Sequence, residues 1–323
     1  MRTALAAMAA ALAAGPWMAS EAATPSPCRL RGVEHPAQCL MLSRPLDPTR
    51  ANGPAIELHV AVLPALSRHK KPDPVFFIAG GPGQSAIELA GQAARLLGRL
   101  GQRRDIVLVD QRGTGRSAPL TCEEDRSDAL DRRVDPVAMR QALARCRTAL
   151  QQLPHGDLRH YATPVAVQDL EAVRRHLGLE RVNVVGVSYG TRVALEWLRQ
   201  SPGAVRRAVL DGVSPPDQAL PASSVVDARA AFDALLAWCR DDAACSRAHP
   251  DLAGTWQALR AAPARTATVA HPLTGRPQVL TLDADRLDAL VRAALYTPVL
   301  ASALPHALAE AAAGHPAALL GLA

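Results

Sequence analysis

A serine flanked by glycines lies between an apolar run and a helical pattern near the middle of the chain. The segment GVSYG at residues 186–190 directly follows a β-branched run at 182–185. A sharp turn from a strand into a helix forces its central residue to a positive φ, and the residues two positions away come too close for any side chain. Gly186 and Gly190 meet this requirement around Ser188. The pattern predicts a nucleophile elbow, in which the Ser188 hydroxyl attacks an acyl carbon.

Two backbone N–H groups near this serine are candidates to bind the oxyanion that such an attack creates. We expect the N–H of Tyr189 to donate to it, because Tyr189 begins the helix after the elbow and the helix dipole adds positive potential there. A glycine-rich turn, GGPG at residues 80–83, follows another apolar run, and we expect it to direct the N–H of Gly81 to the same oxygen. Phosphate binding is not expected at this turn, because no Gly-Lys-Ser or Gly-Lys-Thr follows it.

The elements that must position these turns predict a doubly wound, mostly parallel α/β sheet. Apolar runs alternate with segments of helical spacing, as they do when parallel strands are connected by helices. The expected strands are at residues 56–62, 75–79, 106–109, 182–185 and 208–211, and the expected helices are at 87–97, 165–177 and 193–198. Both glycine-rich turns then lie at the carboxyl ends of strands, where such sheets place their ligands. The proline-containing segment at 45–54 is expected to be a loop.

Three motifs, in this order and at these intervals, resemble those of serine aminopeptidases of the α/β-hydrolase fold. They are AGGPGQS at residues 79–85, DQRGTGRS at 110–117 and GVSYG at 186–190. From about Cys28 to its end, the chain is similar to the exported branch of prolyl and tripeptidyl aminopeptidases. The resemblance therefore suggests both a fold and an activity.

The resemblance implies a serine peptidase that forms an acyl-enzyme on Ser188, with Gly81 and Tyr189 as donors to the oxyanion. It also implies small peptides as substrates, no cofactor, and a helical cap that limits attack to the free N-terminus of the substrate. The arginines of the DQRGTGRS loop, Arg112 and Arg116, would brace that loop beside the active site. One alternative is an esterase of the same fold, because an elbow and an oxyanion hole serve any acyl transfer. The other is a non-catalytic exported binding protein that keeps the pocket.

The other two members of a catalytic triad are not evident in the sequence. The serine needs a histidine base and a carboxylate that orients it, which α/β-hydrolases carry on strands downstream of the elbow. After Asp211, which we interpret as structural, the sequence predicts cap-like helices around residues 230–238, 252–259 and 287–295 and a hairpin of residues 266–269 and 279–282. We therefore expect the catalytic Asp and His, and the last strands of the sheet, to be absent from these 323 residues. The sequence would then be a truncated record of a longer gene or a naturally short product.

The histidines of this C-terminal region have other interpretations. His249 and His271 lie in expected turns, and His306 and His315 lie in or beside alanine-rich helical segments. None of them follows a predicted strand of the main sheet, where a catalytic base is expected. We interpret all four as surface or structural residues.

Aspartate and glutamate side chains of the same region also have simple interpretations. Asp283 and Asp285 precede or begin a helical segment, and we expect them to cap it. Asp227, Asp233 and Glu310 lie in helical segments and are candidates for binding the amine of a substrate. A solvated helix face explains these three residues equally well.

The first residues of the chain predict an export signal. Arg2 precedes an apolar run rich in Ala and Leu at residues 3–14, and a Gly-Pro pair and small residues follow. This run is too short to span a bilayer. We expect a signal peptide at residues 1–22, the N-terminal part of an α/β-hydrolase core at 23–215, and a helical cap region at 216–323. The mature protein would be periplasmic or secreted, without a stable membrane span.

The cysteines agree with export. An even number of cysteines in an exported chain predicts disulfides, and these six fall into pairs of near neighbours. The expected disulfides are Cys28–Cys39, Cys122–Cys146 and Cys239–Cys245. No metal site is expected, because the sequence has no C-x-x-C pair and its close Cys/His pairs are isolated from one another.

The charge composition makes nucleic-acid binding improbable. The formal net charge of +6 comes mainly from arginines that are scattered among acidic residues, since Lys70 and Lys71 are the only lysines. Aromatic residues make up 3% of the chain, so the stacking platforms of single-strand binders are not expected. We interpret the charges as a solvated surface. The sequence does not indicate an oligomeric state.

Overall fold

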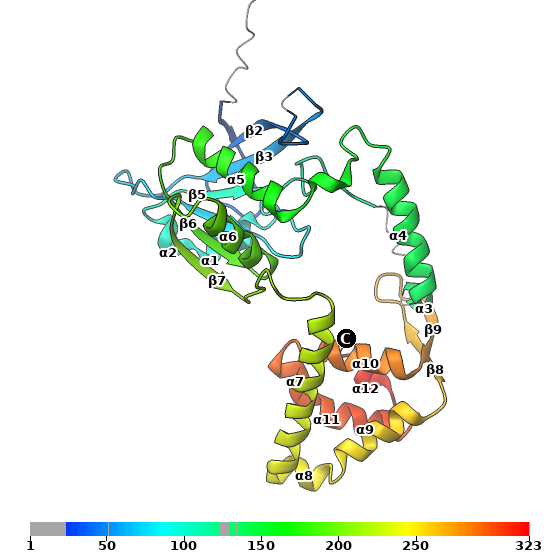
Figure 1. The fold of residues 1–323 in the computed structure, drawn as a ribbon. Helices are drawn as coiled ribbons and strands as arrows, with labels where there is room; N and C mark the ends of the chain where they lie inside the picture. Colours follow the sequence, from blue (N-terminus) through cyan, green and yellow to red (C-terminus); the bar gives the residue numbers. More distant parts are fainter. Residues whose placement is uncertain (1–23, 51, 123–129, 134, 323) are drawn as a thin grey trace, which may run out of the picture.

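A computed structural model describes residues 24–50, 52–122, 130–133 and 135–322 of the chain. The expected signal peptide at residues 1–22 lies outside the described residues. Figure 1 shows an α/β core and, below it in that view, a helical part that we call the cap. The α/β architecture predicted from the sequence is confirmed.

Within the described residues, the core is built on a seven-stranded sheet with the order β1-β2-β3-β5-β4-β6-β7. Its strands are β1 (Ser26–Cys28), β2 (Ala37–Pro45), β3 (Ala55–Leu63), β4 (Val75–Ile78), β5 (Ile106–Val109), β6 (Val182–Val187) and β7 (Val205–Asp211). The strands β4 to β7 pair in parallel, whereas β1, β2 and β3 pair antiparallel. The sequence pattern did not predict β1 or β2, because β2 is only partly buried and does not alternate regularly.

Helices cover both faces of this sheet (Figure 1). On one face lie α5 (Thr163–His176) and α6 (Tyr189–Gln200), and on the other lies α1 (Ala90–Leu96), which α2 (Gly98–Gly101) follows. Successive side chains of a strand point to opposite faces, so Phe76 meets Trp197 of α6 while Phe77 packs toward α1. The Phe76 and Trp197 rings make an edge-to-face contact with their centroids 5.2 Å apart. Burial on both faces explains why β4 and β5 are uninterrupted apolar runs.

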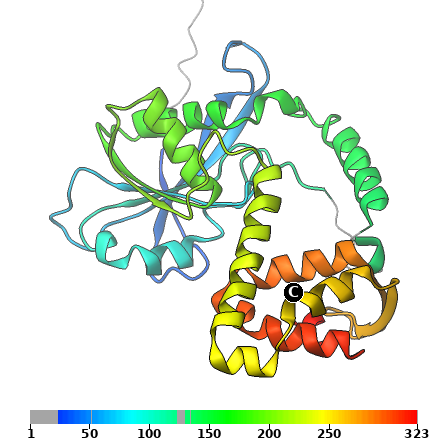
Figure 2. The same ribbon diagram turned by 60° about the horizontal axis from the view of Figure 1, so that its bottom comes forward.

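The cap has a hydrophobic core of its own. It contains α7 (Ala222–Asp241), α8 (Ala243–Ala248), α9 (Leu252–Ala261), the hairpin β8 (Arg265–Ala270) and β9 (Pro277–Leu282), α10 (Ala284–Ala294), α11 (Pro298–Ala312) and α12 (Ala317–Leu320). Phe232, Trp256 and Leu308 are buried together at its centre. Figure 2 shows these helices gathered into one body, which α7 joins to the end of β7. The cap helices and the hairpin predicted from the sequence are confirmed.

A helical excursion from the core reaches the cap at a second place. It consists of α3 (Leu130–Arg133) and α4 (Pro136–Leu150), neither of which the sequence pattern predicted. The Asp131 carboxylate of α3 accepts hydrogen bonds from the backbone N–H of Thr281 at 2.9 Å and from the Arg286 guanidinium. Figure 1 shows α3 beside β9, far along the chain from it. The excursion therefore links the core to the cap without a covalent bond.

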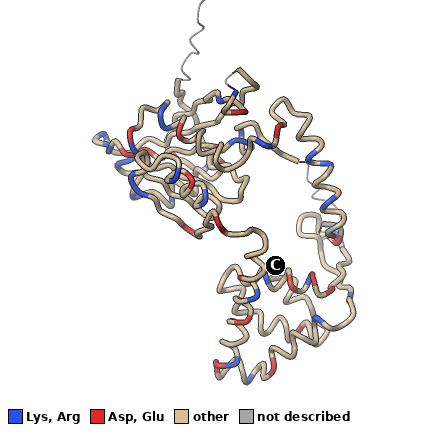
Figure 3. Tube along the Cα trace, in the orientation of Figure 1, with Lys and Arg blue, Asp and Glu red and all other residues tan. Residues whose placement is uncertain are grey.

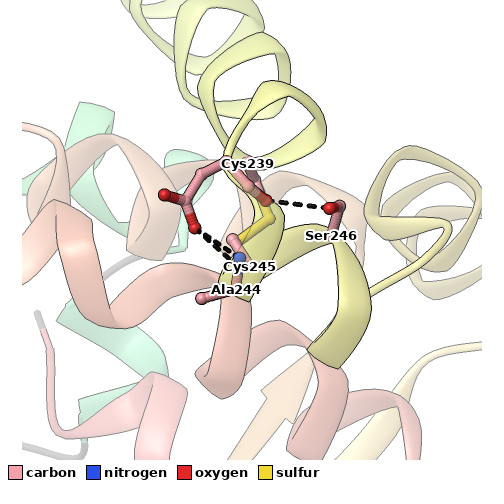
Figure 4. Close-up of a disulfide and its surroundings, with 5 residues drawn as sticks. Cys239, Ala244, Cys245 and Ser246 are labelled. Atoms are coloured by element: carbon pink, nitrogen blue, oxygen red, sulfur yellow. Dashed lines mark hydrogen bonds between the residues drawn. A yellow bond between two sulfur atoms is a disulfide. The ribbon is translucent and has the colours of Figure 1, made fainter.

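Disulfides join the cysteine pairs expected from the sequence. They are Cys28–Cys39 at the start of the sheet, Cys122–Cys146 at α4, and Cys239–Cys245 in the cap. Figure 4 shows Cys239 and Cys245 at the corner between α7 and α8. There the Asp242 side chain accepts hydrogen bonds from the N–H groups of Ala244 and Cys245, at 3.0 and 2.8 Å. The corner is thus fixed by a covalent link and by an N-cap.

Charges of both signs are mixed over the core and the cap (Figure 3). Among the described residues, no helix is both long enough and apolar enough to span a membrane.

The outer edge of the sheet is exposed at β7. Only the first residue of this strand, Val205, is buried, and Val209 in its middle is 56% exposed. No described strand pairs with β7 on its side away from β6. An unpaired edge with an exposed apolar side chain favours pairing with other chains and aggregation.

We predict that this edge limits the solubility of the isolated 323-residue protein, and that Val209→Lys increases the soluble fraction recovered after refolding. A lysine on an edge strand disfavours strand pairing between molecules. Val226→Lys is the matched control, because Val226 is 68% exposed but lies on α7, and it should leave the soluble fraction unchanged. Light scattering during refolding measures the effect. Equal scattering from all three proteins, with a sharp reversible thermal transition in the unsubstituted chain, contradicts the prediction.

Candidate active site

Ser188 occupies a strained turn between β6 and α6. Its φ of 54° and ψ of −120° lie outside the common regions for a residue with a side chain. A Cβ on Gly186 would stand 2.4 Å from the carbonyl oxygen of Gly190, and a Cβ on Gly190 would stand 2.3 Å from that of Ile78. Only glycine fits at these two positions. The sharp strand-to-helix turn predicted from the sequence is present at Ser188, and the role of this serine as a nucleophile stays a prediction.

Hydrogen bonds from β7, from α6 and from the segment after β7 hold the turn. The N–H of Ser188 donates to the carbonyl oxygen of Asp211 at the end of β7, at 2.7 Å. The Ser188 carbonyl oxygen accepts from both the N–H and the hydroxyl of Thr191, and that hydroxyl accepts from the N–H of Ser214 at 2.8 Å. Asp211 thus supports the elbow through its backbone, which agrees with the structural role expected for it.

The GGPG turn lies directly against the elbow. A Cβ on Gly80 would come within 3.0 Å of the Val187 carbonyl oxygen and within 3.1 Å of Ser188 Cβ. Gly81 has a φ of +104°, and the peptide bond from Gly81 to Pro82 is cis. Gly81 and Pro82 line the same cavity as Ser188. The turn after β4 and the first turn of α6 therefore face the hydroxyl from two sides.

A buried carboxylate, Asp110 at the end of β5, connects this turn to the DQRGTGRS loop. Its Oδ1 accepts from the Ser85 hydroxyl at 2.6 Å and from the N–H of Ile87 at 3.1 Å. Its Oδ2 accepts from the N–H of Arg116 at 3.1 Å and lies 3.5 Å from Nδ1 of the buried His59. Burial raises the pKa of the Asp110 carboxyl, but these donors outweigh burial and hold its pKa below the usual value.

The AGGPGQS motif contains Ser85 and the DQRGTGRS motif contains Asp110, but neither motif indicated that these two residues bond to each other. His59 was also missed, because it lies within the alternating strand β3 and is far from both motifs in sequence. A polar side chain within the buried run of residues 58–61 was the available signal. His59 is 5% exposed, so this histidine belongs to the core of the sheet.

Arg112 braces the DQRGTGRS loop from inside the core. Its guanidinium forms a bidentate pair with Asp169 of α5, with distances of 2.6 and 2.9 Å. It also donates to the carbonyl oxygens of Leu46 and His160, each at 2.8 Å. This is the bracing role that the sequence predicted for it. The side chain of Arg116 is exposed instead, and Arg116 holds the loop through its backbone N–H.

The elbow opens into a cavity of about 480 Å³ between the core and the cap, which we call the Ser188 pocket. The core contributes Gly81, Pro82, Ser188 and Tyr189, and the cap contributes Asp227 of α7 and Arg292 of α10. Of the acidic cap residues considered for amine binding, Asp227 alone lines this pocket. Asp233 pairs with Arg229, and Glu310 lies 3.5 Å from His315.

Among the described residues that line this pocket there is no histidine. His271 is buried in the hairpin turn, where its Nδ1 accepts the N–H groups of Leu273 and Thr274. His249, His306 and His315 lie in the cap, outside the lining of the pocket. The described residues also contain no group of three His, Cys, Asp or Glu side chains arranged to hold a metal ion.

The similarity to known proteins includes the residues of the three motifs. A family model described as the alpha/beta hydrolase fold matches residues 73–290, which is more than half of the chain. The chain belongs to the α/β-hydrolase family. The fold and the resemblance predicted from the three motifs are thereby confirmed.

Curated relatives of this hydrolase chain carry peptidase names. It is 29% identical over 195 residues to a tripeptidyl aminopeptidase of Streptomyces lividans, covering 57% of this chain and 36% of the relative. It is 30% identical over 269 residues to the serine protease Hip1 of Mycobacterium tuberculosis, covering 77% of this chain and 48% of the relative. A solved structure of a proline iminopeptidase-related protein from Thermus thermophilus is 23% identical, with a TM-score of 0.33, covering 53% of this chain and 44% of that one. The chain thus spans less than half the length of these proteins.

We predict that the hydrolase core depends strongly on the Arg112–Asp169 pair. Asp169→Asn leaves the Arg112 guanidinium, 4% exposed, without a compensating charge, which costs about 3–5 kcal/mol of the free energy of unfolding. The matched control is Asp233→Asn, which removes the partner of the exposed Arg229 on α7 and should change stability by about 1 kcal/mol or less. A urea titration in which unfolding is monitored by protease sensitivity measures the free energy of unfolding of both variants. An equally small effect of the two substitutions contradicts a bracing role for Arg112.

Proposed function

We propose that this protein is a serine hydrolase of the peptidase class, an aminopeptidase that releases N-terminal residues from small peptides through an acyl-enzyme on Ser188. The observation that carries the proposal is the placement of Ser188. It sits on a positive-φ turn against the Gly81 turn, at the core side of a pocket that cap helices line. The peptidase names of the curated relatives support this class over others.

The reaction follows from the elbow. The Ser188 Oγ bonds to the carbonyl carbon of the scissile peptide bond, and the negative charge that develops on the carbonyl oxygen is stabilised by the N–H groups of Gly81 and Tyr189. The bond from carbon to the leaving nitrogen then breaks, and the nitrogen takes the proton that left Ser188. Water hydrolyses the resulting ester and restores the serine. No cofactor enters these steps.

A base must carry the proton from Ser188 to the leaving nitrogen. The lack of a histidine in the described lining of the Ser188 pocket supports our expectation that the catalytic histidine and its carboxylate lie outside these 323 residues. The greater length of the curated relatives supports the same proposal.

Disulfides in both parts of the structure support export to an oxidising compartment, either the periplasm or the medium. The proposed division is a signal peptide at 1–22, a core at 23–215 and a cap region at 216–323. The end of β7 at Asp211 and the start of α7 at Ala222 support the boundary between core and cap.

We predict that a fluorophosphonate probe labels the protein at Ser188 only when the chain carries the genomic continuation beyond Ala323. The continuation would supply the base that makes the hydroxyl nucleophilic. Ser188→Ala should abolish labelling, and Ser224→Ala is the matched control because Ser224 lines the same pocket. Mass spectrometry of the labelled peptide locates the modified residue. Equal labelling of the 323-residue form would show that a residue within this chain serves as the base.

The substrate class is tested on the form of the protein that carries the continuation beyond Ala323, which we call the extended form. An aminopeptidase should hydrolyse peptide anilides with a free N-terminus and lose this activity when the N-terminus is acetylated. An esterase, the alternative for an elbow of this kind, should prefer short acyl esters and be insensitive to a free amine. A protein that binds peptides but leaves both substrates intact would be the non-catalytic binding protein.

A further inference from the structure

His59 is a buried histidine that the reaction proposed above does not use. It lies in the middle of β3. Ala61, two residues further along this strand, packs on the side of the sheet that α1 covers, so His59 faces the same side. The ring nitrogen Nδ1 of His59 is closed to solvent and has no hydrogen-bond partner among the described residues. A buried polar atom without a partner is unfavourable, and its presence calls for a physical explanation.

The backbone and the side chain of His59 both contact the DQRGTGRS loop. The N–H of Asp110, the first residue of the loop, donates to the His59 carbonyl oxygen at 3.0 Å. The N–H of His59 donates to the hydroxyl of Ser117, the last residue of the loop, at 2.8 Å. The His59 side chain places its Nδ1 3.5 Å from Asp110 Oδ2. One strand residue therefore contacts both ends of the loop and its buried carboxylate.

The Asp110 carboxylate determines which tautomer of the His59 ring fits. Its donors hold its pKa below the usual value, so this carboxyl is ionised at neutral pH. An ionised carboxylate only accepts hydrogen bonds, and Oδ2 therefore attracts a proton on Nδ1 and repels a lone pair there. We assign a proton to Nδ1 on this basis. The contact is longer than an ordinary N–H···O bond, as is common in active-site networks without substrate.

The other side of the Asp110 carboxylate leads to the turn that carries Gly81. Oδ1 is held by the Ser85 hydroxyl, four residues after Gly81. A Cβ on Gly115 would stand 2.1 Å from Asp110 Oδ2 and 2.8 Å from Ser85 Oγ, so the carboxylate has little space to move alone. The turn itself is equally tight, since a Cβ on Gly81 would stand 2.8 Å from the backbone nitrogen of Gly83. A shift of the carboxylate is therefore passed on to the Gly81 turn.

We infer that His59 is a positioning residue for the reaction at Ser188. Its Nδ1–H holds Asp110, Asp110 binds the Ser85 hydroxyl, and Ser85 anchors the tight turn that carries the N–H of Gly81. His59 contacts no reacting atom and acts only through the carboxylate. This inference rests on the proposed function, which gives the Gly81 N–H its role at the oxyanion.

The competing interpretation is that His59 only fills space in the core, and two substitutions separate the two interpretations. Leucine and asparagine each place one atom close to the position of Nδ1. In leucine this atom is a methyl carbon, and in asparagine it is an amide nitrogen that donates hydrogen bonds. A positioning role requires the donor, whereas a space-filling role requires only the volume.

The first measurement is the rate of fluorophosphonate labelling of the extended form. We predict that His59→Leu lowers the rate at saturating probe by at least about tenfold, because a displaced oxyanion donor destabilises the transition state. The probe concentration that gives half of this rate should change by less than about twofold, since the initial complex does not use the oxyanion. His59→Asn should keep the rate of the unsubstituted protein.

The matched control on the same strand is Val60→Ala. Val60 is buried like His59, but it packs on the opposite side of the sheet, away from Asp110. Its substitution should lower the thermal stability by removing core contacts and leave the labelling rate unchanged.

Hydrogen–deuterium exchange of the 323-residue protein measures the positioning without any reaction. His59→Leu should increase exchange of the backbone amides of residues 83–88 by at least about tenfold, because their anchor on Asp110 is loosened. His59→Asn should leave this exchange unchanged. The amides of residues 191–198 in α6 should exchange equally in all variants.

Three results would overturn the inference. The first is an unchanged labelling rate in the His59→Leu protein. The second is an equal loss of rate with leucine and with asparagine, which would show that the donor on Nδ1 does not matter. The third is increased exchange that extends through α6 or appears equally in the Val60→Ala protein, which would indicate a general loss of stability. Failure of the proposed function gives a different result: the extended form with His59 intact would not label at Ser188, while exchange at residues 83–88 would still differ between the two His59 variants.

Discussion

The site depends on the close packing of the backbone where β4, β6 and α6 meet. The Ile78 carbonyl oxygen stands so close to Gly190, and the Gly190 carbonyl oxygen so close to Gly186, that a single added carbon would overlap either one. This contact sets the start of α6 against the end of β4 and forces Ser188 into its positive φ. The cost of that backbone conformation is of order 1–3 kcal/mol. The surrounding sheet must supply that free energy, so a rigid parallel core is a condition for holding an exposed serine on this turn.

Buried charges fix the loops around this rigid point. Asp110 joins the turn after β4 to the loop after β5, and Arg112 joins the latter loop to α5 through Asp169. Each of these groups has several hydrogen-bond partners, which offset the loss of hydration on burial. Loops at the carboxyl edge of a sheet are otherwise its least constrained parts. Here the buried Asp110 and Arg112 fix the positions of these loops relative to Ser188.

Features with local causes could be predicted from the sequence. The uninterrupted apolar runs of β4 and β5, the elbow glycines, and the Asp283 N-cap each depend on residues close together in the chain. The Cys239–Cys245 disulfide is of the same kind, since its cysteines are separated by 6 positions. The bond between Asp131 and Thr281, 150 residues apart, has no such local signal. The same is true of the contact between His59 and Asp110, and of strand β2, which is only partly buried and pairs with β3.

The contact of Asp131 with the hairpin limits how the cap can move. The cap is tethered to the core by the chain between β7 and α7, and a second time where Asp131 binds Thr281 and Arg286. Two attachments leave the cap fewer orientations relative to the core than one attachment does. With both attachments in place, α10 can take fewer orientations above Ser188 than the chain between β7 and α7 alone would allow.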